Sequence, residues 1–225
     1  HCGRESMQSH SALSHLQRIE RSGVIAVMRG MQADTVLQVA RALKAGGIDI
    51  LEVTVDAPGA LRMIEKVTAE LGNEALIGAG TVLDPETARA AISAGAQFIF
   101  SPTLNTEVIE MANRYGKAVI PGVMTPTEIV QACSAGASAV KIFPAGILGP
   151  SYLRQIRGPL PQIPLIPTGG IGAENAAAFI HAGAMAVGVG GALVDLKAIS
   201  AGHFDIITEK AKELVRIIQE ARSRC

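Results

Sequence analysis

The sequence lacks tryptophan altogether and contains few other aromatic residues, and its 225 residues carry no excess charge of either sign. The balance of 20 basic against 20 acidic side chains gives no positive field of the kind that nucleic acid or anionic lipid attracts. No apolar run reaches the ~18 residues of a membrane-spanning helix, and no signal-peptide core is found near the N-terminus. We therefore expect a cytoplasmic protein with a small-molecule partner, and neither a nucleic acid nor a membrane.

Patterns that bind metals are also missing. The three cysteines, Cys2, Cys133 and Cys225, are far apart, so we expect reduced thiols. The five histidines show neither HxH nor HxxxH spacing, so we expect no metal site and no other cofactor. The chain also has no Walker phosphate loop and no serine elbow of the hydrolase type.

Glycine, in contrast, is abundant and occurs just before apolar runs. Four near-copies of one phrase combine a helix end, a glycine and a buried strand: KAGGIDILEV, SAGAQFIFSP, SAGASAVKIF and HAGAMAVGVG. Eight strand-like runs alternate with helical segments, several of them beginning at plausible N-caps: Asp34, Asp84, Asn105 and Thr125. This alternation favours an α/β protein with a closed (β/α)₈ or TIM barrel, and an open doubly wound sheet is the alternative.

The domain organisation follows from the same rhythm. Residues 12–225 are predicted to form a single barrel domain, because no linker or low-complexity segment interrupts them. An extra N-terminal helix around residues 12–22 is expected to cap the bottom of the barrel. Residues 1–11 are predicted to be a tag-like or disordered segment.

Two charged residues occur inside strands that otherwise look like core. Because side chains alternate along a strand, Glu52 and Thr54 are expected to point into the barrel when Leu51 and Val53 point outward. Lys141 is expected to point inward by the same rule. Burial raises the pKa of a carboxyl and lowers that of an amine, which suits a proton carrier and a nucleophile. Structural ion pairing, with Arg29 or between the two residues, and a lysine extending to solvent are the alternatives.

Two glycine-rich strand ends, PTGGIG at residues 167–172 and VGVGGAL at 187–193, complete the pattern. The last two strands of such barrels often bind phosphate through backbone N–H groups. We therefore expect substrate contacts at five residues: Thr168, Gly169, Gly170, Gly190 and Gly191. Close backbone packing is the alternative reason for glycine at these positions.

The motifs together resemble those of the 2-keto-3-deoxy-6-phosphogluconate (KDPG) and 4-hydroxy-2-oxoglutarate (KHG) aldolases, from about Val24 to Val194. Six stretches carry the resemblance: LEVTV, GAGTVL, SP, IPGVMTPTE, VKIFPA and PTGGI. It implies a cytoplasmic, homotrimeric class I aldolase of the Entner–Doudoroff pathway. Such an enzyme cleaves KDPG to pyruvate and glyceraldehyde 3-phosphate, and KHG to pyruvate and glyoxylate.

The resemblance also assigns roles. It implies that Lys141 forms the Schiff base, that Glu52 is the general acid and base, and that Thr81 contacts the pyruvate carboxylate. Pro102 and Phe143 match the pocket walls. Thr54 is added to the substrate contacts because it shares the inward face of Glu52.

Two positions depart from the family pattern. Some members place an arginine four residues after the glutamate, where this chain has Asp56, an anion that would repel a carboxylate. Arg29 is expected to take that role. At the end of the last strand the family commonly has Gly-Ser, where this chain has Gly190 and Gly191. An isomerase or epimerase that uses Glu52 as a plain base, and a barrel that binds an anionic metabolite without turnover, are the competing functions.

Overall fold

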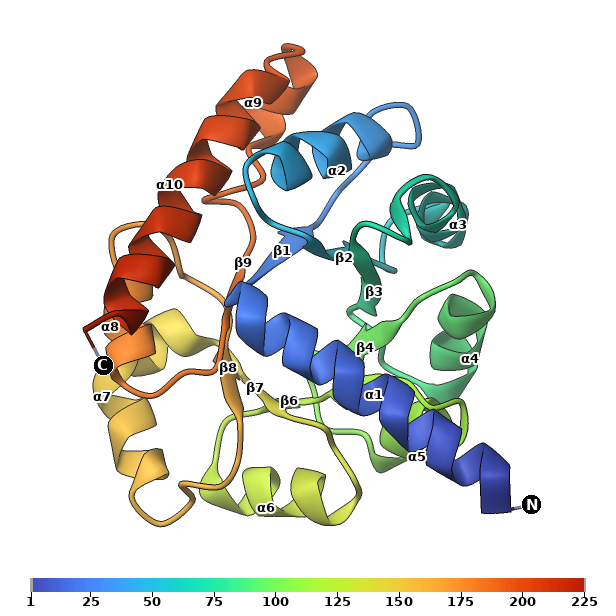
Figure 1. The fold of residues 1–225 in the computed structure, drawn as a ribbon, viewed down its shortest axis with the longest axis vertical. Helices are drawn as coiled ribbons and strands as arrows, with labels where there is room; N and C mark the ends of the chain where they lie inside the picture. Colours follow the sequence, from blue (N-terminus) through green and yellow to red (C-terminus); the bar gives the residue numbers. More distant parts are fainter. Residues whose placement is uncertain (1, 225) are drawn as a thin grey trace.

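The computed structural model describes residues 2–224, which form a parallel α/β barrel surrounded by helices (Figure 1). All strand pairs are parallel, as the alternation of strands and helices predicts. The strands are β1 (Val24–Met28), β2 (Ile50–Thr54), β3 (Leu76–Gly80), β4 (Phe98–Phe100), β5 (Ala118–Ile120), β6 (Gly122–Val123), β7 (Val140–Ile142), β8 (Leu165–Pro167) and β9 (Val187–Val189).

The barrel is assembled from two hydrogen-bonded sheets. One has the order β5-β4-β3-β2-β1-β9 and the other the order β6-β7-β8. The fifth predicted strand is divided into β5 and β6 at Pro121, whose carbonyl accepts a hydrogen bond from the Lys141 amide at 2.9 Å. A bridge between Thr168 and Gly188 joins β8 to β9. The predicted (β/α)₈ barrel is thus confirmed, with its fifth strand in two parts.

The helices form the outer layer, apart from the first one. They are α1 (Cys2–Ser22), α2 (Val36–Ala45), α3 (Ala60–Leu71), α4 (Pro85–Ser93), α5 (Thr106–Arg114), α6 (Pro126–Ser134), α7 (Ala145–Arg157), α8 (Ala176–His181), α9 (Leu196–Ser200) and α10 (Phe204–Arg222). No described helix is both long enough and apolar enough to span a bilayer.

Three of the four predicted N-caps are confirmed. The side chains of Asp84, Asn105 and Thr125 each accept a backbone N–H from the first turn of their helix. The prediction for Asp34 is wrong, because Thr35 is the N-cap of α2 and its side chain makes no capping bond. A backbone turn starts this helix instead, since the Val36 amide donates to the Gln32 carbonyl at 2.9 Å.

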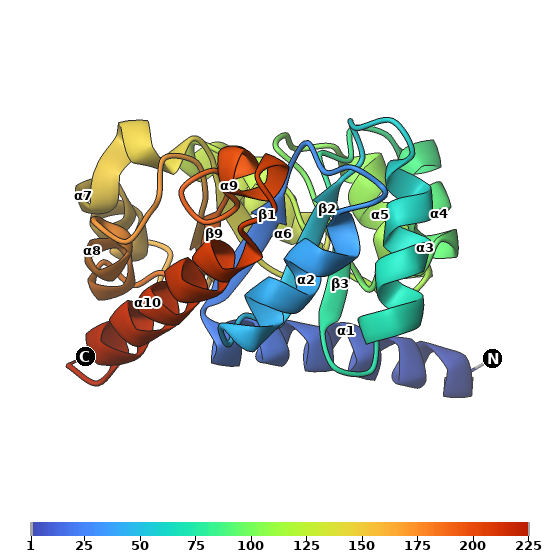
Figure 2. The same cartoon turned by 90° about the horizontal axis from the view of Figure 1, so that it is seen from above.

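The leading helix crosses the bottom of the barrel, where the strands begin (Figures 1 and 2). Its residue Ile19 is fully buried and packs with the first inward residues of the strands, among them Ile25, Ile50 and Leu76. The helix extends back to Cys2, beyond the predicted start near residue 12. The assignment of residues 1–11 to a separate tag-like segment stays a prediction.

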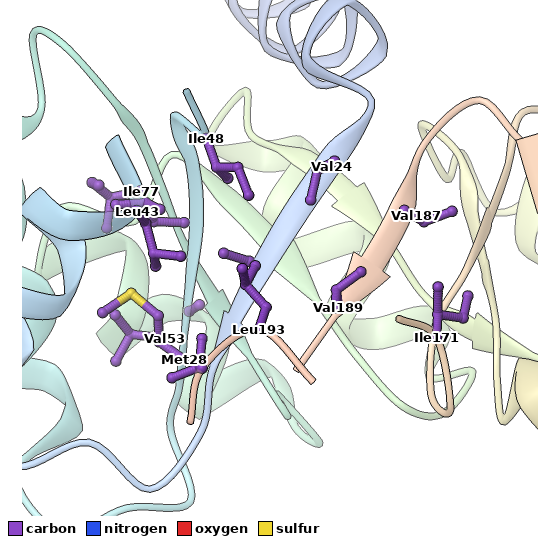
Figure 3. Packing of buried hydrophobic residues seen from close by; sticks show 14 of the residues in the cluster. Val24, Met28, Leu43, Ile48, Val53, Ile77, Ile171, Val187, Val189 and Leu193 are labelled. Atoms are coloured by element: carbon purple, nitrogen blue, oxygen red, sulfur yellow. The ribbon is translucent and has the colours of Figure 1, made fainter. Parts of the chain in front are cut away.

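A larger core fills the space between the strands and the outer helices. Figure 3 shows part of this layer, including Val24 of β1 and Val187 of β9, which are paired in register. Leu51 and Val53 belong to this outer core. The alternation predicted for β2 is therefore confirmed, and Glu52 and Thr54 point inward.

Candidate active site

Glu52 lies in the middle of β2 with its side chain inside the barrel. The residue is 0% exposed, and both of its carboxylate oxygens lack a hydrogen-bond partner among the described residues. Burial raises the pKa of this carboxyl to about 7, against smaller opposing effects of Lys141 and Arg29. The carboxylate occupies the place where a Cβ on Gly80 of β3 would lie. Gly80 thus creates the space for a buried, unpaired acid.

Lys141 lies in β7 and is only 4% exposed, so its side chain does not extend to solvent. Its Nζ atom is 4.4 Å from the centroid of the Phe100 ring and 4.9 Å from that of Phe143. Burial lowers the pKa of the amine, while the charge of Glu52 acts in the opposite direction. A lowered pKa increases the neutral fraction, which is the nucleophilic form.

The structure does not support the alternative that Glu52 is an ion-pair partner. No ion pair within 4.0 Å joins Glu52 to Lys141 or to Arg29 in the described part of the chain. Arg29 instead pairs with Asp56, at 2.7 Å between Nη1 and Oδ2. The two buried charges therefore perturb each other through space without direct contact.

Arg29 connects the ends of three strands. It follows β1, and its second terminal nitrogen donates a hydrogen bond to the hydroxyl oxygen of Thr81 at 2.9 Å. Thr81 follows β3 and has a φ of +59°, which is uncommon for a β-branched residue. Such conformations persist where the surroundings hold them, often at functional sites. Arg29 and Thr81 thus lie together at the mouth of the barrel, and their binding of a carboxylate stays a prediction.

A cavity of about 410 Å³ opens at this mouth. Eight of the predicted site residues line it: Arg29, Lys141, Phe143, Thr168, Gly169, Gly170, Gly190 and Gly191. The sequence reasoning missed four further lining residues: Val27, Ile171, Glu174 and Ala192. Val27 could have been found from the period-two pattern of β1, whereas the two loop residues Glu174 and Ala192 carried no comparable signal.

The backbone conformation requires glycine after β8 but not at Gly191 after β9. Gly169 and Gly170 have φ angles of +89° and +69°, which other residues rarely adopt. Gly191 has an ordinary φ, and a Cβ there would meet nothing within 4 Å. Close packing therefore does not explain the glycine at position 191.

The backbone N–H groups on this wall of the cavity are available to a ligand. In the described structure, four of them donate to no protein acceptor: those of Gly170, Gly190, Gly191 and Ala192. Clustered unpaired N–H groups of this kind bind anions. Glu174 also lines the cavity, and its negative charge disfavours an anion close to it.

Four predicted site residues do not line the cavity. Glu52 and Thr54 are fully buried, and the Thr54 hydroxyl, like the Glu52 carboxylate, has no hydrogen-bond partner in the part of the chain that the structure describes. Thr81 is connected to the cavity through Arg29. Pro102 packs its backbone against Gly122 of β6, and its role as a pocket wall stays a prediction. Among residues 2–224, no three His, Cys, Asp or Glu side chains gather in a way that could hold a metal ion.

A buried lysine with a lowered pKa on the wall of a cavity is what the class I aldolases, which are carbon–carbon lyases, require for Schiff-base chemistry. The chain belongs to the KDPG and KHG aldolase family, whose model matches residues 16–210. This membership decides against the isomerase, the epimerase and the non-catalytic barrel considered from the sequence.

Individual relatives point to more than one substrate. The chain is 39% identical to a 2-dehydro-3-deoxy-6-phosphogalactonate aldolase of Escherichia coli (strain K12), covering 74% of this chain and 82% of that protein. It is 36% identical to a 2-dehydro-3-deoxy-phosphogluconate aldolase of Treponema pallidum (strain Nichols), covering 90% and 96%.

A solved structure is also similar. It is the KDPG aldolase of Legionella pneumophila with pyruvate captured as a covalent carbinolamine intermediate. The TM-score is 0.81 at 33% identity, and the match covers 86% of this chain and 94% of that one.

Proposed function

We propose that this protein cleaves a 2-keto-3-deoxy-6-phospho sugar acid to pyruvate and glyceraldehyde 3-phosphate, with Lys141 as the Schiff-base residue. The observation that carries the proposal is the buried Lys141, with its lowered pKa, on the wall of a 410 Å³ cavity at the barrel mouth. The pyruvate covalently captured in the Legionella relative supports the same chemistry here.

The reaction would run through a covalent imine on Lys141. The neutral amine of Lys141 adds to the C2 carbonyl, and the carbinolamine takes up a proton and loses water to give a protonated imine. This imine accepts the electron pair of the C3–C4 bond as it breaks, while the C4 hydroxyl loses its proton and becomes the aldehyde. The resulting enamine is protonated at C3, and water then releases pyruvate and restores the neutral amine, with loss of the proton taken up when the imine formed.

Glu52 is suited to the proton transfers in this sequence. With a pKa of about 7, it is present near neutral pH both as a base and as an acid. It can take the proton from the C4 hydroxyl and return a proton to C3. No described residue forms a hydrogen bond with its carboxylate, which leaves both oxygens for the substrate or a water.

The other contacts divide between the two ends of the substrate. Arg29 and Thr81 would bind the carboxylate next to the reacting carbonyl, with Phe143 as a wall beside Lys141. The unpaired N–H groups after β8 and β9, together with Thr168, would bind the phosphate. KHG, which has no phosphate, would use only the first set.

Trapping with borohydride tests the proposal. Incubation with pyruvate and borohydride should add one reduced pyruvate at Lys141, located by peptide mass spectrometry, and inactivate the protein. Lys141→Ala should not be labelled. Labelling of another residue, or none in the native protein, would reject the proposal.

The choice of sugar acid needs a second measurement. Steady-state kcat/KM values on KDPG, its galactonate epimer and KHG would rank the substrates, since relatives with both phosphorylated activities are similar to this chain. We place KDPG first. A value for the galactonate epimer at least equal to that for KDPG would contradict this order. The homotrimer, the cytoplasmic location and the Entner–Doudoroff pathway stay predictions.

A further inference from the structure

Asp56 is a charged residue at the barrel mouth to which the proposed reaction gives no role. It lies two residues beyond the end of β2 and four residues after Glu52. From the sequence, its negative charge was expected to repel a substrate carboxylate. In the structure, its Oδ2 atom instead accepts a hydrogen bond from Arg29 at 2.7 Å.

The ion pair fixes one side of the Arg29 guanidinium while the other side contacts Thr81. Nη1 is bound to Asp56 and Nη2 donates to the Thr81 hydroxyl oxygen at 2.9 Å. A guanidinium has only donors, so the Thr81 oxygen is the acceptor in this bond and its own hydrogen stays available. The chain Asp56, Arg29, Thr81 therefore ends in a hydroxyl donor that can point at an anion.

We propose that Asp56 is a positioning residue for the substrate: it holds Arg29 so that Arg29 and Thr81 bind the carboxylate of the 2-oxo acid in a fixed orientation. This inference rests on the proposed function. Asp56 does not touch the reacting atoms and acts through Arg29, which lines the cavity together with Lys141.

Two physical considerations favour positioning over stabilisation of the fold. The side chains of Arg29 and Asp56 are 54% and 46% exposed, and exposed ion pairs contribute little to folding. An arginine that is free in solution must instead be ordered each time a ligand binds. Ordering one long side chain weakens binding by roughly threefold to tenfold, and Asp56 removes most of this cost.

The direct repulsion between Asp56 and a bound carboxylate is the opposing effect. Solvent and salt screen it, because Asp56 is half exposed and charges in water are screened over about 8 Å at physiological ionic strength. Its carboxylate is also compensated by Arg29 at 2.7 Å. The positioning effect is therefore expected to exceed the repulsion.

The experiment measures pyruvate binding by the concentration that gives half-maximal borohydride trapping at Lys141. Asp56→Ala should raise this concentration threefold to tenfold, and Asp56→Asn, which keeps a neutral acceptor, by less. Glu70→Gln is the matched control, because it removes an ion pair of similar exposure, Arg41–Glu70, far from the cavity. It should leave the midpoint unchanged.

A double variant distinguishes action through Arg29 from a separate effect. Arg29→Ala should raise the midpoint by itself, and adding Asp56→Ala should cause no further change. A second readout is the acid limb of the kcat/KM profile. It should move to lower pH in Asp56→Asn, because the charge of Asp56 raises the pKa of Glu52 while those of Lys141 and Arg29 lower it.

The outcomes separate the inference from the function on which it rests. An unchanged or lower midpoint in Asp56→Ala, or an additive effect in the double variant, would overturn the positioning role and leave the aldolase proposal intact. Absence of trapping at Lys141 in the native protein would reject the proposed function and this inference with it.

Discussion

The two ends of the barrel each hold a lysine whose pKa is lowered by burial, yet their surroundings differ. Lys141 lies near the mouth. Burial lowers its pKa, and the charge of Glu52, which is also inside the barrel, raises it. Lys117 lies at the opposite end, directly before β5, and its charge lowers the pKa of His15 on α1. At the mouth a buried acid accompanies the amine, whereas at the bottom the neighbour is a second base.

This difference shows what a lowered pKa does and does not indicate. Half-burial against a covering helix is sufficient to lower the pKa of Lys117, without any arrangement for chemistry. Lys141 has in addition a cavity beside it and a carboxyl that titrates near neutral pH. The combination, and not the lysine by itself, indicates an active site.

The largest expected effect comes from exchanging the two lysines for alanine, one at a time. Lys141→Ala should lower kcat by roughly 10⁴-fold or more, as removal of a covalent nucleophile does. Lys117→Ala should retain kcat within about threefold, because no reacting group is near it. Steady-state kinetics on KDPG gives both values. Comparable losses of kcat in the two variants would contradict the conclusion that only Lys141 lies in an active site.

The next effect concerns the acid at the mouth. Glu52→Gln preserves the shape of the side chain but cannot transfer a proton, so kcat should fall by roughly 10² to 10⁴. Pyruvate trapping at Lys141 should persist, since the neutral amine remains. A variant that keeps full turnover would show that another group moves the protons.

The same substitution should also change how stability depends on pH. The pKa of Glu52 is about 7 in the folded protein and 4.5 as a free group, so folding opposes its ionisation. The native protein therefore loses stability as pH rises from about 4.5 through 7. Urea unfolding at pH 5 and pH 8 should show that the free energy of unfolding of Glu52→Gln, relative to the native protein, rises by about 2–3 kcal/mol between these pH values. A constant difference would show that Glu52 does not titrate as described.

A smaller effect is expected at Gly191, where the cavity wall has room for a side chain. A hydroxyl bonded to a phosphate is worth about 1.5–3 kcal/mol, so Gly191→Ser should raise kcat/KM for KDPG by roughly tenfold to a hundredfold. KHG, which has no phosphate, serves as the control and should be unaffected. An equal change on both substrates, or none, would place position 191 away from the phosphate.

The smallest effect belongs to the bottom of the barrel. The pKa of His15 is lowered, chiefly by burial, and its Nδ1 atom has no hydrogen-bond partner among the described residues. For a base with a lowered pKa, stability is complete above 6.5 and is lost as pH falls below that value. His15→Gln should reduce this loss, and thermal unfolding at pH 7.5 and 5 would detect it. The pH dependence of stability that His15 causes is thus opposite in sign to that of Glu52.

Much of the site could be predicted because it follows from alternation along strands. The aliphatic residues on the outer face of β2 place Glu52 inside the barrel whatever the loops do, and the same rule applies to Lys141. The repeated glycine phrase likewise indicates where each strand begins. Gly95 and Gly136, for example, have φ angles of +108° and +96° at helix ends, as such a phrase requires.

The rest depends on contacts that periodicity does not encode. Arg29 pairs with Asp56 because their loops meet at the mouth, and no local pattern in either segment specifies that geometry. Glu174 reaches the cavity from a loop after β8 for the same reason. The start of α2 does not follow from its residue types, because a backbone turn, and not a side-chain cap, begins it.

Gly80 has a consequence for how such sequences change over time. The carboxylate of Glu52 fills the position of the missing Cβ, so the two residues, 28 positions apart, cannot vary independently. A chain that replaced this glycine would have to lose or displace the acid, and a chain that lost the acid would be free to replace the glycine. In a collection of related sequences, the two positions should therefore covary, and a barrel with Lys141 but without this pair would be a candidate for an altered or lost proton transfer.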